Sequence, residues 1–319
     1  MVACGKAPGK GQYRFTQTTR VTTAFPIRYI EPVFRPPSEA DSLILPVTNG
    51  CSWNRCTYCE MYTAPQKKFA LRDEDELRQS IARSAALFGN QVVRVFLGDG
   101  DALALSTRRL MAVLQAIRTH MPQVRRISSY CLPRNVRHKS VAELTELRQA
   151  GLSLAYVGAE SGDDLVLQRV NKGETLASTT DALCKLGEAG ISRSVMLLNG
   201  LGGKAHSQQH ALNSAQLANA TQPEFLATLV VSFPHGEARF RAHYPEWEPC
   251  DLPDLFAEMA TLLQATDLKR TVFRSDHASN WLVLKGTLGA EKERMLAQVR
   301  TAIEQPQHAA LRPAWARGL

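Results

Sequence analysis

The feature that most constrains the fold is a regular alternation along the first three quarters of the chain. Short apolar runs, each the length of one strand, alternate with longer stretches of helical periodicity, and the connections are short. Such an alternation favours parallel strands joined by right-handed crossovers. The predicted strands are 43–48, 92–97, 124–130, 152–158, 191–198 and 224–233. The predicted helices are 73–88, 107–120, 140–151, 161–170, 175–189 and one near 205–219.

Six strand–helix units fit either an open doubly wound sheet or a barrel. No Gly-rich dinucleotide motif or P-loop follows the first strand, and a cysteine-rich loop stands there instead. We therefore predict an α/β fold, with a partial (β/α)6 TIM-type barrel over residues 41–245. Residues 1–40, rich in Pro, Gly and Thr, are predicted to be an irregular N-terminal lead-in that wraps this core. Residues 246–319 are predicted to form a C-terminal α+β cap continuous with the core, containing helix 251–266, strand 270–274, a loop and helix 290–304.

Charge and hydropathy exclude some classes of protein and leave others open. The chain contains no run of eighteen uncharged apolar residues, and no apolar run follows its basic N-terminus. We therefore expect no membrane span, no secretory signal, no membrane partner and a cytoplasmic location. Lys plus Arg exceed Asp plus Glu by 38 − 30 = 8. This excess is compatible with nucleic acid or with anionic metabolites, but nucleic acid is not favoured because no long basic tail or RNA-binding signature accompanies it.

Three of the seven cysteines, Cys51, Cys56 and Cys59, lie within nine residues, and the other four are scattered. An odd, uneven set of this kind is not a disulfide framework. Thiolates hold iron–sulfur clusters, and short spacings let one loop surround a cluster. With three cysteines, one iron lacks a protein ligand and can bind a substrate or cofactor. Because the loop follows the first strand, we expect it at the carboxyl ends of the strands, where α/β folds place their active sites.

The same cysteines have two alternative interpretations. A Cys-x2-Cys pair is common among zinc ligands, so Cys56 and Cys59 also fit a structural zinc site completed by His138 or Cys131. A redox-active pair is less favoured because it leaves Cys51 without a role. The scattered cysteines of the barrel and tail are expected to be buried free thiols: Cys131, Cys184 and Cys250.

Together with later motifs, the cysteine loop resembles the core of the radical S-adenosylmethionine (SAM) superfamily. More closely, it resembles the group with the Elongator/methylthiotransferase/NifB-like core domain. The usual spacing there is Cys-x3-Cys-x2-Cys, whereas this chain has Cys-x4-Cys-x2-Cys, a spacing found in one subfamily. The resemblance spans nearly the whole chain and rests on CSWNRCTYC (51–59), FLGDGDALAL (96–105), GAESG (158–162), FRSDHASNWLVLKG (273–286) and LRPAWARGL (311–319).

The resemblance implies a [4Fe–4S] cluster on Cys51, Cys56 and Cys59, with SAM as the second cofactor on the open iron. An electron from a donor such as a flavodoxin or ferredoxin would cleave SAM reductively to a 5′-deoxyadenosyl radical. That radical would abstract hydrogen from an unidentified substrate in the barrel. A small molecule is favoured because no nucleic-acid module is appended. A tRNA-modifying radical SAM enzyme and a non-catalytic zinc or iron–sulfur protein are the alternatives.

The resemblance also assigns roles to segments that follow the strands. The GDGD segment (Gly98, Asp99, Gly100, Asp101) is expected to bind the SAM amino group through one of its two carboxylates. Its glycines permit close backbone approach, and a simple turn is the alternative interpretation.

The later strand ends complete the expected SAM site. Glu160 or Ser161 is expected to bond the ribose hydroxyls or the methionyl part, and Ser161 also fits a helix N-cap. Asn199 and Gly200 are expected against the adenine, together with Tyr58 from the cysteine loop.

Two polar segments have less specific expectations. A basic run after the third strand is expected to bind the SAM carboxylate or an anionic substrate, with at least two of its members simply solvated. These residues are Arg134, Arg137, His138 and Lys139. The polar segment 273–280 is expected either to line the substrate cavity or to form a satisfied internal network.

Overall fold

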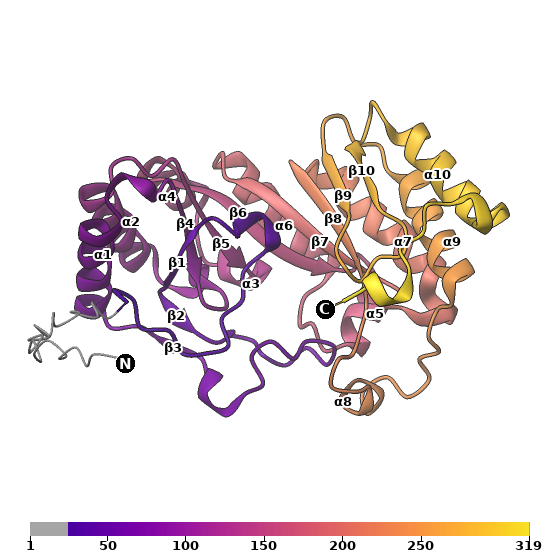
Figure 1. Ribbon diagram of the computed structural model, residues 1–319, viewed down its shortest axis with the longest axis horizontal. Coiled ribbons are helices and arrows are strands. Elements are labelled where there is room, and N and C mark those ends of the chain that lie inside the picture. Colours follow the sequence, from indigo (N-terminus) through magenta and orange to yellow (C-terminus); the bar gives the residue numbers. More distant parts are fainter. Residues whose placement is uncertain (1–24, 319) are drawn as a thin grey trace, which may run out of the picture.

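A single eight-stranded sheet organises the computed structural model, which describes residues 25–318 (Figure 1). Its order is β1-β4-β5-β6-β7-β8-β9-β10; all neighbouring pairs are parallel except β9 and β10. β1 and β10 are the edges, so the sheet is not closed. This confirms the predicted α/β fold with a partial barrel. The strands are β1 (Leu43–Pro46), β4 (Arg94–Gly98), β5 (Arg126–Cys131), β6 (Leu152–Glu160), β7 (Ser192–Asn199), β8 (Phe225–Val230), β9 (Val272–Ser275) and β10 (Leu284–Thr287).

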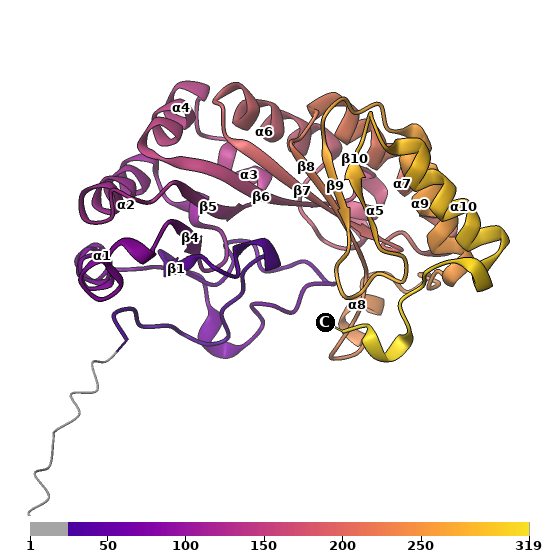
Figure 2. The same cartoon turned by 45° about the horizontal axis from the view of Figure 1, so that its top comes forward.

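The long helices lie along one side of the curved sheet (Figure 2). Five of the seven have a side-chain N-cap; for example, Asp73 accepts hydrogen bonds from two backbone N–H groups of α1, and Ser140 and Glu143 form a capping box in α4. The helices are α1 (Glu74–Phe88), α2 (Thr107–His120), α4 (Val141–Ala150), α6 (Leu176–Glu188), α7 (Gly203–Thr221), α9 (Leu252–Ala265) and α10 (Lys292–Glu304). No helix in the described part of the chain has the length and apolar character needed to span a bilayer.

The two faces of the sheet bury different side chains. On the helix-covered face, alternate strand residues such as Val157, Val195 and Leu226 join the main hydrophobic core. On the opposite, inner face, Phe96, Tyr130 and Tyr156 form a small aromatic cluster with edge-to-face contacts. These rings fill the inner face at the middle of β4 and β6 and near the end of β5.

The tail differs from the prediction in one respect. The expected strand at 270–274 is β9, and it joins the barrel sheet beside β8. β10 was not predicted, because Leu284–Thr287 is too short to show a period and is a strand only through its antiparallel pairing with β9. Four further short elements were also not predicted: β2 (Thr48–Asn49), β3 (Ala70–Leu71), α3 (Pro133–Val136) and α8 (Ala238–Arg241).

The described part of the lead-in packs against the core as expected. Glu39 is buried and accepts hydrogen bonds from Arg126 at 2.8 Å and Tyr156 at 2.6 Å. The Ile30 carbonyl accepts from the Lys67 ammonium at 2.8 Å. The remainder of the predicted lead-in, residues 1–24, lies outside the described residues, as does Cys4. The proposed division at residues 41–245 and 246–319 stays a prediction.

Candidate functional site

The cysteine loop follows β2 and packs against the GDGD loop that follows β4. A Cβ atom on Gly100, whose φ is +101°, would lie 1.9 Å from the Gly50 carbonyl oxygen. Thr48 Oγ1 donates to the Asp99 carbonyl at 2.7 Å, so the two loops are also hydrogen-bonded. Only a glycine at position 100 permits this approach. The expected meeting of the two motifs at the carboxyl ends of the strands is therefore present.

Asp101 is bonded to the cysteine loop. Its carboxylate accepts hydrogen bonds from Ser52 N at 2.7 Å, from Ser52 Oγ at 2.5 Å and from Asn135 Nδ2 at 2.9 Å. The side chain is buried, and burial raises the pKa of its carboxyl group although these hydrogen bonds lower it. Asp101 therefore positions the residue next to Cys51, a role that the sequence motif did not indicate.

Asp99 is likewise engaged by the chain. Its carboxylate forms a buried ion pair with Lys67, and the buried Tyr62 side chain lies beside it. Burial raises the pKa of Asp99, while the Lys67 ammonium opposes that rise. The other carboxylate oxygen, Oδ1, has no hydrogen-bond partner within the described residues. The sequence did not indicate this role for Lys67, which lies in the irregular segment after the cysteine loop.

A second segment, residues 170–174 after α5 (Asp164–Arg169), runs along the other side of the cysteine loop. The Val170 carbonyl accepts from Thr57 N at 3.0 Å, and the Asn171 carbonyl accepts from Trp53 Nε1 at 2.9 Å. The Asn171 side chain donates to the Arg55 carbonyl at 3.2 Å. The loop is thus held on both sides by backbone and side-chain hydrogen bonds, which restricts the positions of the three thiols.

Lys172, in the same segment, joins two of the predicted site residues. Its buried ammonium lies 3.2 Å from Glu160 Oε1 and 3.2 Å from the Tyr58 hydroxyl. Burial lowers the pKa of the Lys172 ammonium, whereas the neighbouring Glu160 and Cys56 raise it. The net shift of this pKa is upward. A Cβ on Gly158 would lie 2.1 Å from Glu160 Oε1, so the glycine makes room for this carboxylate. Glu160 and Tyr58 are therefore brought together by a cation that sequence reasoning missed.

The three thiols fit an iron–sulfur cluster in number, chemistry and setting. All are free; Cys56 is buried, and Cys51 and Cys59 are partly exposed. Burial raises the pKa of Cys51, and it raises the pKa of Cys59 to about 11, so binding to iron must displace their protons. Within residues 25–318, no three His, Cys, Asp or Glu side chains are arranged to hold a single metal ion.

The two residues proposed to complete a zinc site differ in their surroundings. His138 is exposed, whereas Cys131 is buried and its thiol donates to the Leu132 carbonyl at 3.3 Å. Of the other cysteines that we expected to be buried, Cys131 is buried, but Cys184 and Cys250 are partly exposed.

Ser161 takes part in a buried network and does not face open space. Its hydroxyl lies 2.7 Å from His210 Nδ1, and His210 Nε2 lies 3.8 Å from Glu258 Oε1. Glu258 accepts from Gly200 N at 2.7 Å and from Ser207 Oγ at 2.5 Å. The side chains of Ser161, His210 and Glu258 are nearly inaccessible to solvent. This network connects the loop after β6 with the loop after β7, and the N-cap of α5 is Asp163 instead of Ser161.

Asn199 and Gly200 lie at the end of β7 as predicted, but the Asn199 side chain is on the helix-covered face. It lines a cavity of about 320 Å³ together with Val230, Ser275, Asn280 and apolar residues of α9. The side chains of residues 196 and 198 have the opposite orientation because strand residues alternate. The Gly200 backbone, with φ at +77°, is itself engaged: its N–H donates to Glu258, and its carbonyl accepts from Gly203 N at 3.0 Å.

The basic run after β5 is divided between structure and solvent. Arg134 is held by Glu174 Oε1 at 2.9 Å and by the Gly173 carbonyl at 2.5 Å. Lys139 is buried and donates to the Leu103 and Asn135 carbonyls. Arg137 and His138 are exposed, as expected for two of the four.

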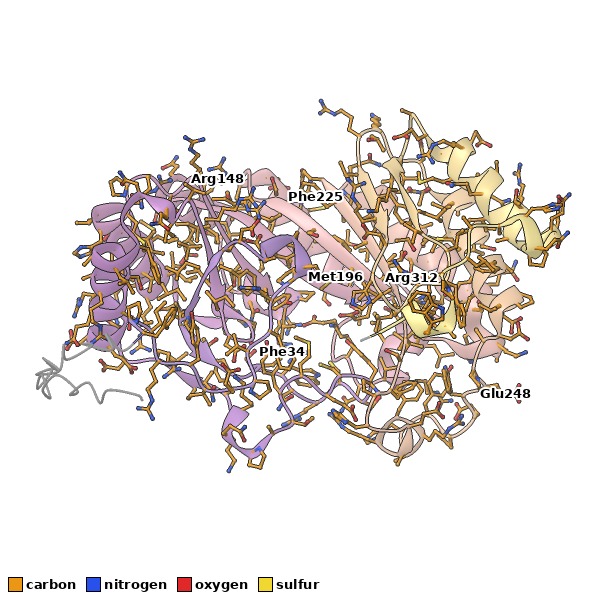
Figure 3. All side chains as sticks on the ribbon, viewed as in Figure 1. Phe34, Arg148, Met196, Phe225, Glu248 and Arg312 are labelled. Carbon is orange, nitrogen blue, oxygen red and sulfur yellow. The ribbon has the colours of Figure 1, made fainter. Side chains whose placement is uncertain are left out.

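The polar segment 273–280 is mainly an internal network. Ser279 Oγ accepts from Val230 N at 3.1 Å, and Asn280 Nδ2 donates to the Thr228 carbonyl at 2.8 Å. Arg312, labelled in Figure 3, donates to the carbonyls of residues 276, 277 and 280. Ser275 and Asn280 nevertheless line the cavity that contains Asn199. The expected internal network is therefore present, and a role of this segment in lining a substrate cavity stays a prediction.

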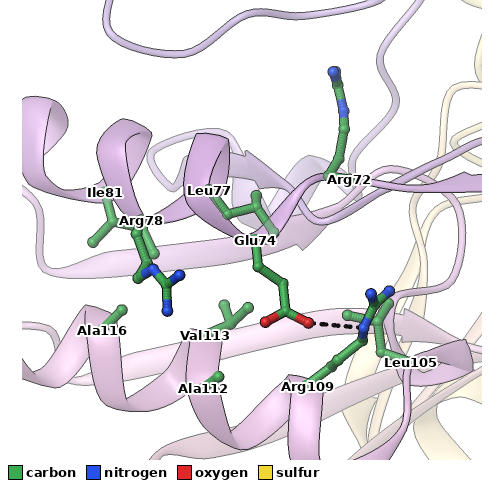
Figure 4. A pocket seen from close by; sticks show the side chains of 10 residues that line it. All are labelled: Arg72, Glu74, Leu77, Arg78, Ile81, Leu105, Arg109, Ala112, Val113 and Ala116. Atoms are coloured by element: carbon green, nitrogen blue, oxygen red, sulfur yellow. Dashed lines mark ion pairs between the residues drawn. The ribbon is translucent and has the colours of Figure 1, made fainter.

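A groove on the helical layer is not part of this site. It lies between α1 and α2, where Glu74 pairs with Arg109 at 2.9 Å (Figure 4). No residue predicted to bind the cluster or SAM lines it.

The change Asp101→Asn tests the positioning role. In this variant an NH2 group replaces one of the two carboxylate oxygens and faces hydrogen-bond donors. We therefore expect the free energy of unfolding to fall by about 1.5–3 kcal/mol. We also expect lower iron retention after desalting, measured by iron and sulfide assay. Asp41→Asn, at an exposed aspartate, is the matched control. Full iron retention with a loss of SAM affinity alone would instead show that Asp101 binds SAM.

Known structures share the fold of this chain at low sequence identity. Coproporphyrinogen III oxidase (HemN) from Escherichia coli, described as a radical SAM enzyme, aligns with a TM-score of 0.54 and 18% identity, covering 70% of this chain and 52% of that one. The radical SAM methyltransferase TsrM from Kitasatospora setae aligns with a TM-score of 0.47 and 20% identity, covering 59% and 36%. The chain thus spans about half the length of HemN and about a third of TsrM.

Family membership rests on a sequence comparison. A search of curated proteins found no match. The model of the radical SAM superfamily matches residues 45–217, more than half of the chain and a range that includes the cysteine loop, the GDGD loop and Glu160. Members of this superfamily are enzymes that cleave SAM at an iron–sulfur cluster. The chain therefore belongs to the radical SAM superfamily, whose cofactors are a [4Fe–4S] cluster and SAM.

Proposed function

We propose that the protein cleaves SAM reductively and uses the resulting 5′-deoxyadenosyl radical to abstract hydrogen from a small-molecule substrate. The observation that carries this proposal is the set of three free thiols on one loop, held from both sides at the carboxyl ends of the strands. Asp101 fixes the loop next to Cys51, and residues 170–174 fix it around Cys56. The proposed ligands are Cys51, Cys56 and Cys59.

When bound, the cluster supplies the electron that breaks a carbon–sulfur bond of SAM, giving methionine and the adenosyl radical. The protein holds and shields the reactants. Of the two nearby carboxylates, Asp99 pairs with Lys67, and Asp101 accepts from Asn135. The partial burial of the thiols limits access of water to the site.

For the SAM amino group, the backbone of the GDGD loop is a better candidate than either carboxylate. The Gly98 and Asp99 carbonyls already accept hydrogen bonds from Val47 N and Thr48 Oγ1. The Gly100 carbonyl accepts none within residues 25–318. We therefore assign the ammonium contact to Gly100, with Asp99 Oδ1 contributing negative charge nearby.

For the ribose hydroxyls we assign Glu160 in preference to Ser161. Carboxylate oxygens accept hydrogen bonds from hydroxyl groups, and Lys172 orients the Glu160 carboxylate while leaving further lone pairs available. Ser161 is committed to His210 and has no solvent-accessible surface. Its role is to position the loop that carries Glu160.

The inner face of β7 and β8 is the proposed substrate surface. Met196, Leu198, Ala227 and Leu229 are partly exposed there, whereas Leu197, Asn199, Leu226 and Thr228 on the helix-covered face are buried. Figure 3 labels Met196 and Phe225 on these strands. An apolar surface of this kind favours a substrate with an apolar body, bound beside the adenosyl group.

The deciding experiment is anaerobic. The cluster is reconstituted, dithionite and SAM are added, and 5′-deoxyadenosine is measured by mass spectrometry. Formation of 5′-deoxyadenosine at a rate that depends on both reductant and SAM supports the proposed function. A four-iron protein that binds SAM but yields no 5′-deoxyadenosine, with or without extracts containing small molecules, would contradict it.

A further inference from the structure

One residue of the cysteine loop, Trp53, is enclosed by arginines. The guanidinium carbon of Arg134 lies 3.8 Å from the centre of a Trp53 ring, and that of Arg55 lies 5.1 Å away. Arginine favours the face of an aromatic ring because of its π-electron density. Two cations and one indole ring therefore form a single surface unit, to which the exposed Arg137 is added one turn after Arg134. We call Trp53, Arg55, Arg134 and Arg137 the Trp53 patch.

Trp53 and Arg134 of the patch are held in place by the residues around them. Trp53 Nε1 donates to the Asn171 carbonyl at 2.9 Å, and Gly173 has φ at +70° and no room for a Cβ, which would lie 2.4 Å from the indole. Arg134 is fixed by the buried Glu174. A surface that is already ordered loses little conformational entropy when a partner binds.

The charge of the patch is not neutralised on its outer side. Glu174 compensates Arg134 from below, but Arg55 and Arg137 form no ion pair within residues 25–318, and both are exposed. The nearby lysines Lys139 and Lys172 are buried and directed inward. The outer surface is therefore a small cationic area with an aromatic centre.

The position of the patch relates it to electron entry. Trp53 and Arg55 lie between Cys51 and Cys56, and Arg55 is covalently adjacent to Cys56. Anything that binds the patch rests against the backbone that carries the proposed cluster ligands. A donor placed there lies against the loop that carries the proposed ligands Cys51 and Cys56.

We propose that the Trp53 patch is the docking surface for an acidic electron-transfer protein that donates one electron to the cluster. The electron leaves the reduced cofactor of the donor and enters the cluster, so that the donor is oxidised by one electron and the cluster is reduced by one. This inference rests on the proposed function, since only a cluster that turns over needs a donor. Opposite charges steer such encounters and raise association rates by about 10- to 1,000-fold.

Nucleic acid fits the patch less well. A phosphate backbone is typically neutralised by about 6–10 basic contacts along a track. The Trp53 patch provides three arginines, one of which is committed to Glu174. A compact acidic surface on a protein matches three clustered cations better.

The test measures cluster reduction by an acidic flavodoxin, prereduced to its hydroquinone, in anaerobic stopped-flow spectroscopy. Arg55→Glu is expected to lower the second-order rate constant about tenfold or more at low ionic strength. Added salt is expected to slow the wild type and to narrow the difference. Arg55→Lys keeps the charge and is expected to retain most of the rate. Arg108→Glu, an equal charge change at an exposed residue of α2, is expected to behave as the wild type.

Two readouts separate this inference from the proposed function. Iron content and reduction by photoreduced deazaflavin, a small reductant that needs no docking, are expected to be equal in wild type and Arg55→Glu. Equal flavodoxin rates in the two proteins would overturn the docking proposal, as would a change confined to tRNA retention on a column. A protein that takes up no cluster at all would overturn the proposed function and this inference with it.

Discussion

Replacing Cys51, Cys56 or Cys59 with alanine is expected to abolish cluster binding and 5′-deoxyadenosine formation. A [4Fe–4S] cluster that already leaves one iron without a protein ligand loses a second anchor in each variant, and two thiolates on a short loop cannot hold it. We expect iron to fall from about four per chain to near zero after gel filtration. The broad visible absorption of the cluster should disappear in parallel.

Cys184→Ala is the matched control for these variants. Cys184 is a partly exposed free thiol on α6 with no contact to the loop, so its loss should leave iron content unchanged. Circular dichroism separates ligand loss from unfolding, because the three variants are expected to keep the wild-type helical signal. Retention of the full cluster by any one of them would remove that cysteine from the ligand set.

Lys67→Met is expected to lower the free energy of unfolding by about 3–5 kcal/mol. The Lys67 ammonium is fully buried, pairs with the buried Asp99 carboxylate and donates to the Ile30 carbonyl. Removing only the cation leaves a buried carboxylate without its counter-charge. Denaturant unfolding monitored by fluorescence measures the effect, and Lys185→Met, which breaks a partly exposed ion pair with Asp181, should cost well under about 1 kcal/mol.

The pH dependence of the Lys67→Met penalty has a defined sign. Burial already raises the folded-state pKa of Asp99, and loss of Lys67 removes a group that lowers it. The folded variant then binds more protons than the unfolded chain, so its stability falls as pH rises through the range between the two pKa values. The penalty should therefore shrink toward acidic pH. A penalty that grows on acidification would contradict the role assigned to this ion pair.

Local sequence determined the repeating units of the fold. The hydrophobic pattern of an apolar run such as 152–158, or of a capped stretch such as 140–151, is visible within the segment itself. Both elements lie close to their predicted positions, as β6 and α4. The cysteine loop was also recognisable, because the spacing of ligands on one loop is a covalent property. The parallel order of the strands followed from the same alternation.

The individual roles within the site did not follow from sequence. Asp101 and Ser161 occupy motif positions, yet their hydrogen bonds go to Ser52, Asn135 and His210. Asn199 was placed on the correct strand end but on the opposite face of the sheet, because a strand reverses its side-chain direction at every residue. An error of one residue in register is enough to exchange a ligand for a core residue.

The sequence alone therefore determined the strand–helix order and the loop of three thiols, since these depend on period and spacing within short windows. Only the tertiary structure decided what surrounds that loop. Lys172 reaches Tyr58 across 114 positions of sequence, and Trp53 meets Arg134 through packing of separate loops. Such contacts arise when distant segments are brought to the same edge of the sheet and their buried polar groups must find partners. That requirement belongs to the assembled fold and has no local pattern in the chain.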